Sequence, residues 1–370
     1  MDHDDFRPIA PRRPPPPPGL AARLRESLFS NPLSGTATLL LLALLAWGLP
    51  RLLDWALWQA VWAPDPEACQ AARGVGACWG VVAEKHRLIL FGRYPFEQQW
   101  RPALALALWA LLAVGSVLRG GRPGAGRVLG IAWAAGLLAG VLLMRGGFAG
   151  LPLVTTDQWG GLPLTLLLAL VAIATAFPIA VALALGRRSG PPLLRGLATL
   201  YIELVRGVPL VSVLFMASFI FPLLLPPGSN PDVLLRVLAG LSLFAAAYLA
   251  ETIRAGLQSV PLAQAQAARS LGMTAWQVQR LVLLPQALRA VLPALLNSFI
   301  STFKDSSLVT IVSLYELTGA LGLALSGDPV WRPFKVEGYL FVTAIYFLGC
   351  AAMSAGGRWA ERRWRHGGCA

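Results

Sequence analysis

The chain has 370 residues, of which 56% are hydrophobic and only 13% are charged, and its mean hydropathy is +0.61. Soluble globular domains carry nearer to a quarter charged residues. The charges are also clustered, so several apolar stretches approach or exceed the roughly 20 residues that cross a bilayer. Composition therefore excludes an ordinary soluble domain and predicts an all-α, polytopic helical membrane protein.

The formal net charge of +13 would indicate nucleic-acid binding in a soluble protein. Here the basic residues lie in short loops between apolar runs, which is the pattern that orients membrane proteins. We therefore expect a lipid bilayer around the chain and no nucleic acid. The histidines and cysteines show no metal-ligand spacing, so no metal site is expected.

The N-terminal part begins with a charged, proline-rich tail at residues 1–35, which has no features of a cleavable signal peptide. A membrane region at 36–158 follows, with predicted spans at 36–53, 103–117 and 129–143. Its polar loop, at 63–100, carries Cys69 and Cys78. An oxidising compartment would allow these cysteines to form a disulfide, and a free pair is an equally open alternative.

Five further spans are predicted in the C-terminal part. The segment at 258–286 is helix-forming but too polar to span, and the tail at 358–370 is basic. With eight spans and both termini inside, the loops richest in arginine all lie on the inner side, as the positive-inside rule requires. The five predicted spans are 162–185, 197–224, 234–257, an interrupted span at 288–312, and 339–353.

The polar segment contains a spaced motif. Gln266-Ala267-Ala268 is followed after three residues by Gly272, after nine more by Val282, and then by Leu284-Pro285. This resembles the EAA signature of ABC importer permeases, in which Glu-Ala-Ala, Gly, Ile and Leu-Pro have the same spacing. Gln266 replaces the glutamate and Val282 replaces the isoleucine.

The residues themselves predict a helix–turn–helix. Alanines would line one face of a helix at 264–271, Gly272 would end it with a positive φ, and a second helix at 274–284 would end at Pro285. The resemblance implies that this loop docks into a groove on an ATPase subunit and transmits its motion. An ordinary amphipathic connector is the alternative. The uncharged Gln266 weakens any charge-assisted contact, and a second, different permease would then supply the acid.

Three other stretches are similar to the polar amino-acid uptake branch of these permeases. They are WGGLPLTL at 159–166, ELVRGVPL at 203–210, and NSFI with FKDSSLV at 297–309. The N-terminal third, with CW at 78–79 and FGRYPF at 91–96, looks like the larger permeases of general L-amino-acid importers. The resemblance implies a five-helix, type I ABC permease domain at 159–357.

The resemblance also implies a function. The chain would form a pathway for L-amino acids of broad specificity across the bacterial inner membrane. Its partners would be ABC ATPase subunits, a second permease and a periplasmic amino-acid-binding protein. The chain lacks a Walker A loop, so ATP and Mg²⁺ would be bound by the ATPase, and no cofactor or catalytic residue is expected in this chain. A secondary transporter and a membrane-embedded enzyme are the rival hypotheses.

Polar residues inside the apolar runs are candidates for the pathway or a gate. Lys304 and Asp305 are ionisable groups in a span, where such groups usually face a cavity or a partner helix. They could contact a zwitterionic substrate, or they could pair structurally. Glu203 and Arg206, at i and i+3, are predicted to form a structural or gate pair. The remaining pathway candidates are Asn297, Ser298 and Ser306.

Overall fold

The computed structural model describes residues 19, 25–119, 124–226, 228–229 and 231–366. The expected tails at 1–35 and 358–370 therefore fall partly outside the described residues. The described part is helical and contains no β-strand. It divides into two compact units, Met1–Val61 with Glu67–Cys78, and Trp62–Pro66 with Trp79–Ala370, which are described separately.

The first unit contains one long apolar helix and a cross-linked loop. Helix α2, Pro32–Leu53, begins at Asn31, whose side chain accepts a hydrogen bond from the Ser34 amide at 2.7 Å. It continues through a π-helical turn to Trp58 and is long and apolar enough to span a membrane. Short helix α3, Pro66–Ala71, follows. The loop beyond it is closed by a disulfide between Cys69 and Cys78, whose Cα atoms lie 5.4 Å apart.

The second unit holds five unbroken candidate spans, so the described chain has six with α2, or up to eight if each of two bent helix pairs is one span. Each predicted span lies within one of these elements, and the all-α polytopic fold is confirmed. The five unbroken helices are α5 (Trp100–Arg119), α6 (Ala125–Arg145), α7 (Gly161–Gly186), α10 (Val233–Ser259) and α16 (Lys335–His366).

One predicted span is not continuous. The stretch at 197–224 divides into α8, Pro192–Gly207, and an apolar segment, Leu210–Leu224, at an angle of 106°. Val208 is extended, with φ −107° and ψ 137°, because the residue before a proline is disfavoured in the helical region. Pro209 also lacks the amide that would continue the helix. The predicted span at 197–224 is therefore a bent pair of helices, which counts toward the eight spans only if the pair crosses the membrane as one broken span.

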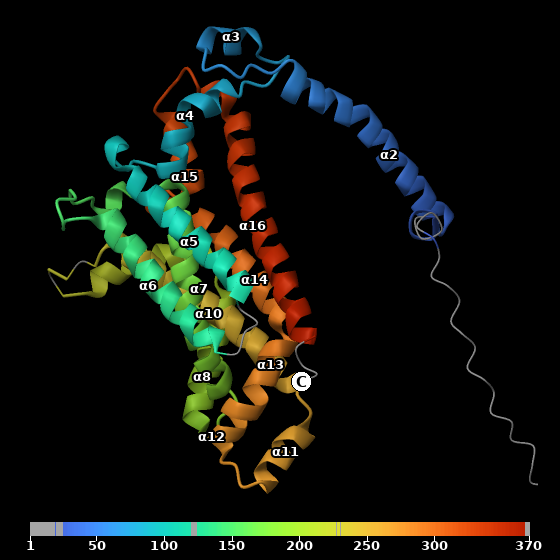
Figure 1. Ribbon diagram of the computed structural model, residues 1–370, viewed down its shortest axis with the longest axis vertical. Coiled ribbons are helices and arrows are strands. Elements are labelled where there is room, and N and C mark those ends of the chain that lie inside the picture. The colour runs from blue at the N-terminus through green and yellow to red at the C-terminus, as the bar shows by residue number, and fades with distance from the viewer. Residues whose placement is uncertain (1–18, 20–24, 120–123, 227, 230, 367–370) are drawn as a thin grey trace, which may run out of the picture. The chain divides into compact units, whose positions relative to one another are not determined.

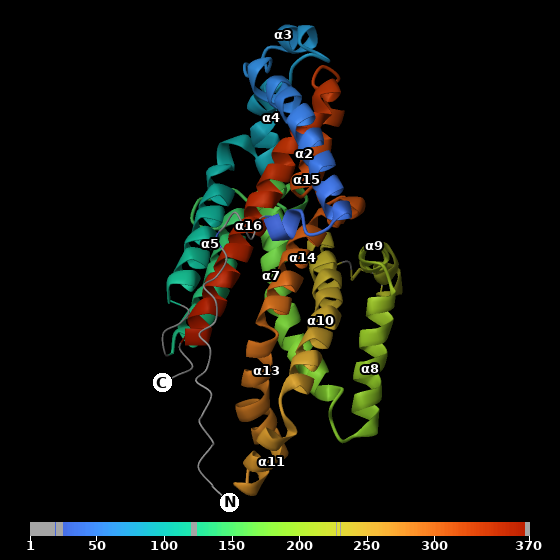
Figure 2. The same ribbon diagram turned by 90° about the vertical axis from the view of Figure 1, so that its right-hand side faces the viewer.

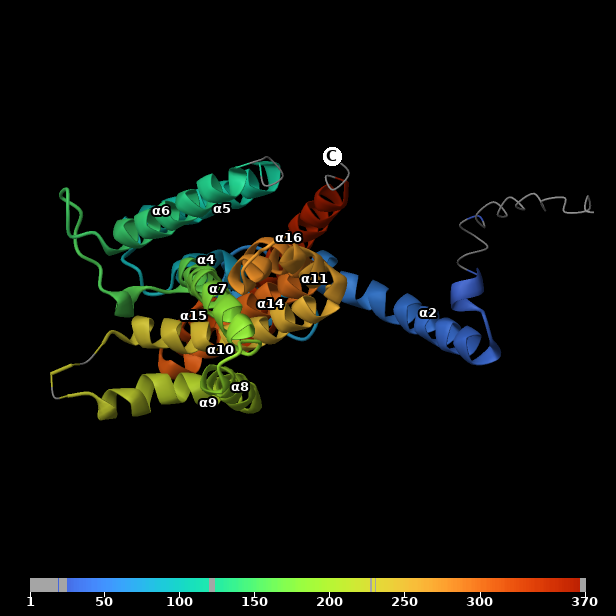
Figure 3. The same cartoon turned by 90° about the horizontal axis from the view of Figure 1, so that it is seen from below.

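Helices α7 and α10 form the centre of the second unit (Figures 1 and 2). They pack closely because alanines recur along their contact, and small residues allow helix backbones to approach. The α5–α6 hairpin lies as a separate layer beside α7, and α8 lies on the other side of α10 (Figure 3). The small residues of the central contact include Ala172, Ala176, Ala180 and Ala184 of α7 and Ala246 and Ala250 of α10.

A close contact between backbones joins α4, Gly80–Phe91, to the start of α7. Gly92 and Gly161 have positive φ values of 62° and 63°. A Cβ atom on Gly92 would lie 2.5 Å from the Cα of Gly160. Only glycine fits such a contact without strain, so this junction fixes α4 against the helix that opens the C-terminal domain.

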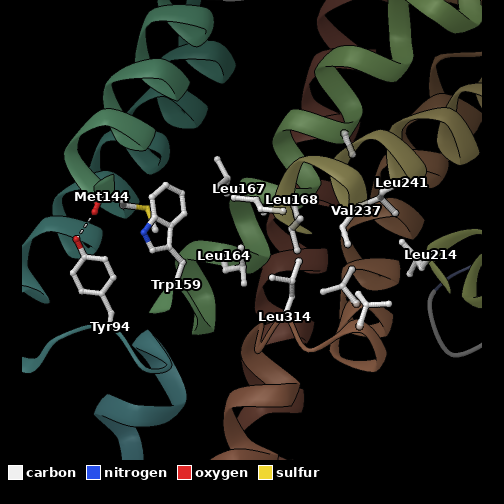
Figure 4. Packing of buried hydrophobic residues seen from close by; sticks show 14 of the residues in the cluster. Tyr94, Met144, Trp159, Leu164, Leu167, Leu168, Leu214, Val237, Leu241 and Leu314 are labelled. Atoms are coloured by element: carbon white, nitrogen blue, oxygen red, sulfur yellow. Dashed lines mark hydrogen bonds between the residues drawn. The ribbon is translucent and has the colours of Figure 1, made fainter. Parts of the chain in front are cut away.

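A buried arginine anchors the α5–α6 hairpin to the same end of the unit. Arg101 is fully buried, and its guanidinium donates to the carbonyls of Leu143 at 2.7 Å, Pro152 at 3.0 Å and Met144 at 3.1 Å. These include the last carbonyls of α6, where the helix dipole favours a cation. The Tyr94 hydroxyl also donates to Met144 at 2.6 Å (Figure 4). Burial raises the pKa of Tyr94 to about 12, so it remains a protonated donor.

Replacing Arg101 by methionine should destabilise the second unit, because several buried carbonyls would lose their donors. Buried groups without partners cost about 1–3 kcal/mol each, so we expect a loss of roughly 3 kcal/mol or more. Thermal unfolding of the purified chain would measure it. Arg145→Met is the matched control, since Arg145 is exposed at the end of α6. Equal midpoints for the two variants would contradict the anchoring role.

Candidate coupling loop and translocation site

The predicted helix–turn–helix is present between α10 and the next span. Helix α11, Leu262–Ser270, ends in a turn in which Gly272 has φ 80°. The Gly272 amide donates to Arg269 at 2.9 Å, and the Met273 amide donates to Ala268 at 3.2 Å. This pair of bonds is the Schellman motif, which satisfies the last carbonyls of a helix. The turn therefore depends on a residue that tolerates a left-handed conformation.

The second arm begins at Thr274 and runs further than expected. Thr274 and Gln277 form a capping box at the start of α12, Ala275–Gln277, which sequence analysis missed although its residue pattern is visible. The helical path then continues through a π-helical segment, Val278–Leu283, into α13, Leu284–Ala290. Our prediction that this helix ends at Pro285 was wrong. Pro285 lies in the first turn of α13, where its missing amide is tolerated.

The motif residues differ in their exposure. Gln266, Ala267, Gly272 and Pro285 are exposed, whereas Val282 and Leu284 are half-buried. Ala268 is buried and belongs to the core cluster that includes Val278 and Leu283. We expected the alanines to present one common outer face, and they do not. Ala268 instead provides the close approach between the two arms of the loop.

Two apolar side chains at the turn are exposed to an unusual degree. Leu271 is 82% exposed and Trp276 is 61% exposed, on either side of Gly272. Neither residue belongs to the motif, so sequence analysis missed both. They could have been found as large apolar residues that flank a turn in a segment too polar to span a membrane. This tip lies at the end of the second unit opposite α4 (Figure 1).

A pocket of about 420 Å³ lies between α9 (Leu210–Phe215), α10 and α14 (Leu292–Asp305). Three predicted pathway residues meet there, Asn297, Ser298 and Asp305, which lie on one face of α14 at helical spacing. Ser301 and Thr302 complete the polar wall, and Phe244 and Tyr248 face them from α10.

The other two predicted pathway residues do not line this pocket. Lys304 is exposed on another face of α14. Ser306 is fully buried, and its hydroxyl donates to the Phe303 carbonyl at 2.7 Å. Adjacent residues on a helix point in different directions, so Lys304 and Asp305 diverge.

The pocket combines one carboxylate with hydroxyl and amide groups. No described residue forms a hydrogen bond or ion pair with the Asp305 carboxylate. Ser298 and Thr302 donate to carbonyls of their own helix, at 3.1 Å and 3.0 Å, and keep acceptor capacity for a ligand. Such a site can hold an ammonium group beside the carboxylate and accept further donors from the hydroxyls.

A cluster of five charged residues joins α7, α8 and α10 near the pocket. Glu251 of α10 accepts from Arg187 at 3.0 Å and from Arg254 at 2.9 Å, and its carboxylate lies 3.9 Å from Arg206. Arg187 also reaches Glu203 at 2.7 Å. The expected direct pair between Glu203 and Arg206 is not formed. Both residues bind into the cluster through partners on other helices.

Tyr248 connects this charged cluster to the pocket. It lines the pocket from α10, and its hydroxyl lies 3.4 Å from the Arg206 carbonyl. The Arg206 guanidinium lies 5.6 Å from the centre of its ring. Any movement of α8 relative to α10 would therefore change contacts at one wall of the pocket.

The chain is similar to known proteins over most of its length. Residues 176–366 match the family described as binding-protein-dependent transport system inner membrane component. The inner membrane amino-acid ABC transporter permease protein YhdY of Escherichia coli (strain K12) is 42% identical over 346 residues, 93% of each chain. The glutamate/glutamine/aspartate/asparagine transport system permease protein BztC of Rhodobacter capsulatus is 34% identical over 401 aligned residues, 92% of each chain.

Among solved structures, a chain in a crystal structure of an amino acid ABC transporter with histidines is similar. It is 34% identical, and the match covers 55% of this chain and 92% of that one with a TM-score of 0.49. The family match and the two long relatives decide the assignment. The chain belongs to the binding-protein-dependent transport system inner membrane components and, within them, to the amino-acid ABC transporter permeases, which are transport subunits and not enzymes.

Proposed function

We propose that this permease forms a pathway for L-amino acids of several side-chain types across the bacterial inner membrane. It would assemble with ABC ATPase subunits, a second and different permease, and a periplasmic amino-acid-binding protein. ATP and Mg²⁺ would bind to the ATPase, and this chain would hold no cofactor. The name of the relative BztC, which covers four amino acids, supports broad specificity.

The pocket between α9, α10 and α14 is the observation that carries the proposal. An amino acid offers an ammonium group in every case, while its side chain varies. Asp305 supplies one fixed charge for the ammonium, and the polar wall of Asn297, Ser298 and Ser301 is adaptable. A site that recognises the common part of the substrate and leaves the rest loosely defined suits a permease of broad specificity.

The α11–α12 loop would couple this pathway to the ATPase. Leu271 and Trp276 form an exposed apolar tip, which fits recognition of a helix in a groove. Gln266 is exposed beside it and carries no charge. A partner permease with an acidic residue at the equivalent position would bind the ATPase more tightly at its own site. The two permeases would then engage the ATPases unequally.

We also propose that both termini are cytoplasmic. The end of the second unit that carries the α11–α12 loop also carries Arg187, Arg188 and Arg195, as expected for a cytoplasmic face. The polar loop at 63–100 would then lie in the periplasm. It contains the disulfide between Cys69 and Cys78, and disulfides persist in the oxidising periplasm.

Replacing Gly272 by valine should abolish uptake and reduce co-purification of the ATPase, with membrane insertion intact. The left-handed conformation costs an L-residue about 1–2 kcal/mol, and a β-branched residue tolerates it least. Gly272→Asn is the matched control, since asparagine visits this conformation and should retain most activity. Mild-detergent purification of the tagged permease with quantified ATPase would measure the effect. Equal behaviour of both variants, or a parent chain that retains no ATPase, would contradict the coupling model.

Asp305→Asn should lower amino-acid transport by tenfold or more, because a charged hydrogen bond is worth about 1.5–3 kcal/mol. Uptake into proteoliposomes at saturating binding protein is the measurement. Lys304→Gln is the matched control, since it removes a neighbouring charge outside the pocket. A similar loss in both variants would mean that charge on α14, and not the pocket, governs transport.

Glu251→Gln should weaken the contact of α7, α8 and α10, because the arginines around it would keep only Glu203 as an acidic partner. We expect a stability loss of about 2 kcal/mol, which is below the range for fully buried pairs because this carboxylate is partly exposed. Glu203→Gln should cost no more than about 1 kcal/mol, since Glu203 is more exposed and pairs with one arginine. Thermal unfolding monitored by tryptophan fluorescence would rank the two, and the reverse ranking would remove Glu251 from the centre of the cluster.

A further inference from the structure

The α5–α6 hairpin opens into a groove at its loop end. The groove has a volume of about 650 Å³. One wall runs along α5 from Leu108 to Arg119, and the other runs along α6 from Gly124 to Ala132. It lies in the layer beside α7 and contains none of the residues that line the pocket on α14 (Figure 3). It is therefore separate from the proposed pathway.

The groove runs along one side of the seam between the two helices, which stay in contact along it. Near the far end a Cβ atom on Gly140 would lie 2.6 Å from the Trp109 ring, and the Trp109 indole donates to the Gly136 carbonyl at 3.1 Å. Closer to the loop, the Trp133 indole of α6 donates to the Ser116 hydroxyl of α5 at 2.9 Å. Within the groove, a Cβ atom added to Gly115 would meet no heavy atom within 4 Å, so the groove is open space on the surface of the seam.

The length of the groove matches one leaflet of a bilayer. Leu108 and Arg119 are separated by 11 helical steps, or about 16 Å at 1.5 Å per residue. Half of the hydrocarbon thickness is about 15 Å. An acyl chain that enters at the level of Arg119 would therefore extend along the groove to about the centre of the membrane.

The mouth of the groove is positively charged. Arg119 lines it, and no hydrogen bond or ion pair joins its side chain to another described residue. The sequence contains no aspartate or glutamate between Glu97 and Asp157, so the hairpin has no acidic partner of its own. Basic pockets between membrane helices at the cytoplasmic side are suited to the phosphates of anionic lipids.

We propose that this groove binds one anionic phospholipid from the leaflet on the side of the α11–α12 loop, with its phosphate at Arg119 and an acyl chain along the seam of α5 and α6. The lipid would fill the open groove beside Gly115. It would also neutralise Arg119 at the membrane surface. The charge at the mouth selects an anionic headgroup, and the apolar walls accept any chain of leaflet length.

Native mass spectrometry of the permease complex, purified from membranes and re-equilibrated with phosphatidylglycerol or phosphatidylethanolamine, tests this site. We expect one phosphatidylglycerol to remain bound per copy of this chain. Arg119→Gln should weaken its retention about fivefold, because a basic residue near the surface contributes about 1 kcal/mol. Gly115→Leu should displace the lipid by filling the groove, which has room for the side chain.

Two matched controls separate the site from general lipid binding. Arg127→Gln removes an exposed arginine of the same hairpin that does not line the groove, and Gly130→Leu adds the same bulk at an open glycine outside it. Both should leave retention unchanged. The proposal would be overturned if the variants and the controls lost the same amount of bound lipid. It would also be overturned if both lipids were retained equally, or if the parent complex held no lipid. A disulfide that formed between the Gly115→Cys variant and a helix of another protein would also overturn it, because a protein and not a lipid would then occupy the groove.

Discussion

The turn at Tyr315–Leu317 holds the C-terminal domain together at the end away from the α11–α12 loop. Glu316 is fully buried, and its carboxylate accepts from the Gly319 amide at 2.8 Å, the Thr318 amide at 2.9 Å and the Tyr346 hydroxyl at 2.8 Å. It thereby caps α15, Leu317–Ser326, and binds α16. A buried carboxylate needs such donors, and the helix N-terminus supplies a favourable field.

The same turn also holds α7. Its Tyr315 carbonyl accepts from the Gly161 amide at 2.9 Å, and its Leu317 amide donates to the Thr165 hydroxyl at 3.0 Å. Within a bilayer every backbone polar group must find a partner in the protein. One irregular turn between α14 and α15 therefore draws its partners from α7 and α16, and it fixes these helices relative to one another.

Toward the opposite end, the helices of the domain are joined by exposed and half-buried contacts. They are the charged cluster at Glu251, the bend at Val208–Pro209 and the α11–α12 loop. Two helix pairs are bent, one by 106° at Val208–Pro209 and the other by 67° between α13 and α14. The pocket lies between the two ends, and α10 and α14 line it.

Within the second unit, helix α4 is attached at the fixed end. Gly92 makes the backbone contact with α7, and Lys85 of α4 forms an ion pair of 2.8 Å with Asp328 beyond α15. The hydrogen bond from Lys85 lowers the pKa of Asp328. Arg101 then secures the α5–α6 hairpin, so the hairpin contacts the domain without entering the pocket.

The sequence by itself determined the class, the spans and the place of the helix–turn–helix at Gly272. Apolar runs of bilayer length, basic loops and the spacing from Gln266 to Pro285 are local features, and helices in a membrane follow local hydrophobicity because their hydrogen bonds are internal. The Gly272 turn was predictable for the same reason. The bend at Val208–Pro209 was also predictable from the proline, although our predicted span at 197–224 did not include a break.

Only the tertiary structure decided which side chains meet. Spacing alone suggested that Glu203 would pair with Arg206, but Glu203 pairs with Arg187 at the end of α7. Spacing also suggested that Ala268 would face outward, but Ala268 packs against the second arm of the loop. The tertiary structure also separated Asp305, which faces the pocket, from Lys304 and Ser306, which do not. The direction of a side chain depends on helix rotation and on the neighbouring helices, and neither is encoded within a single span.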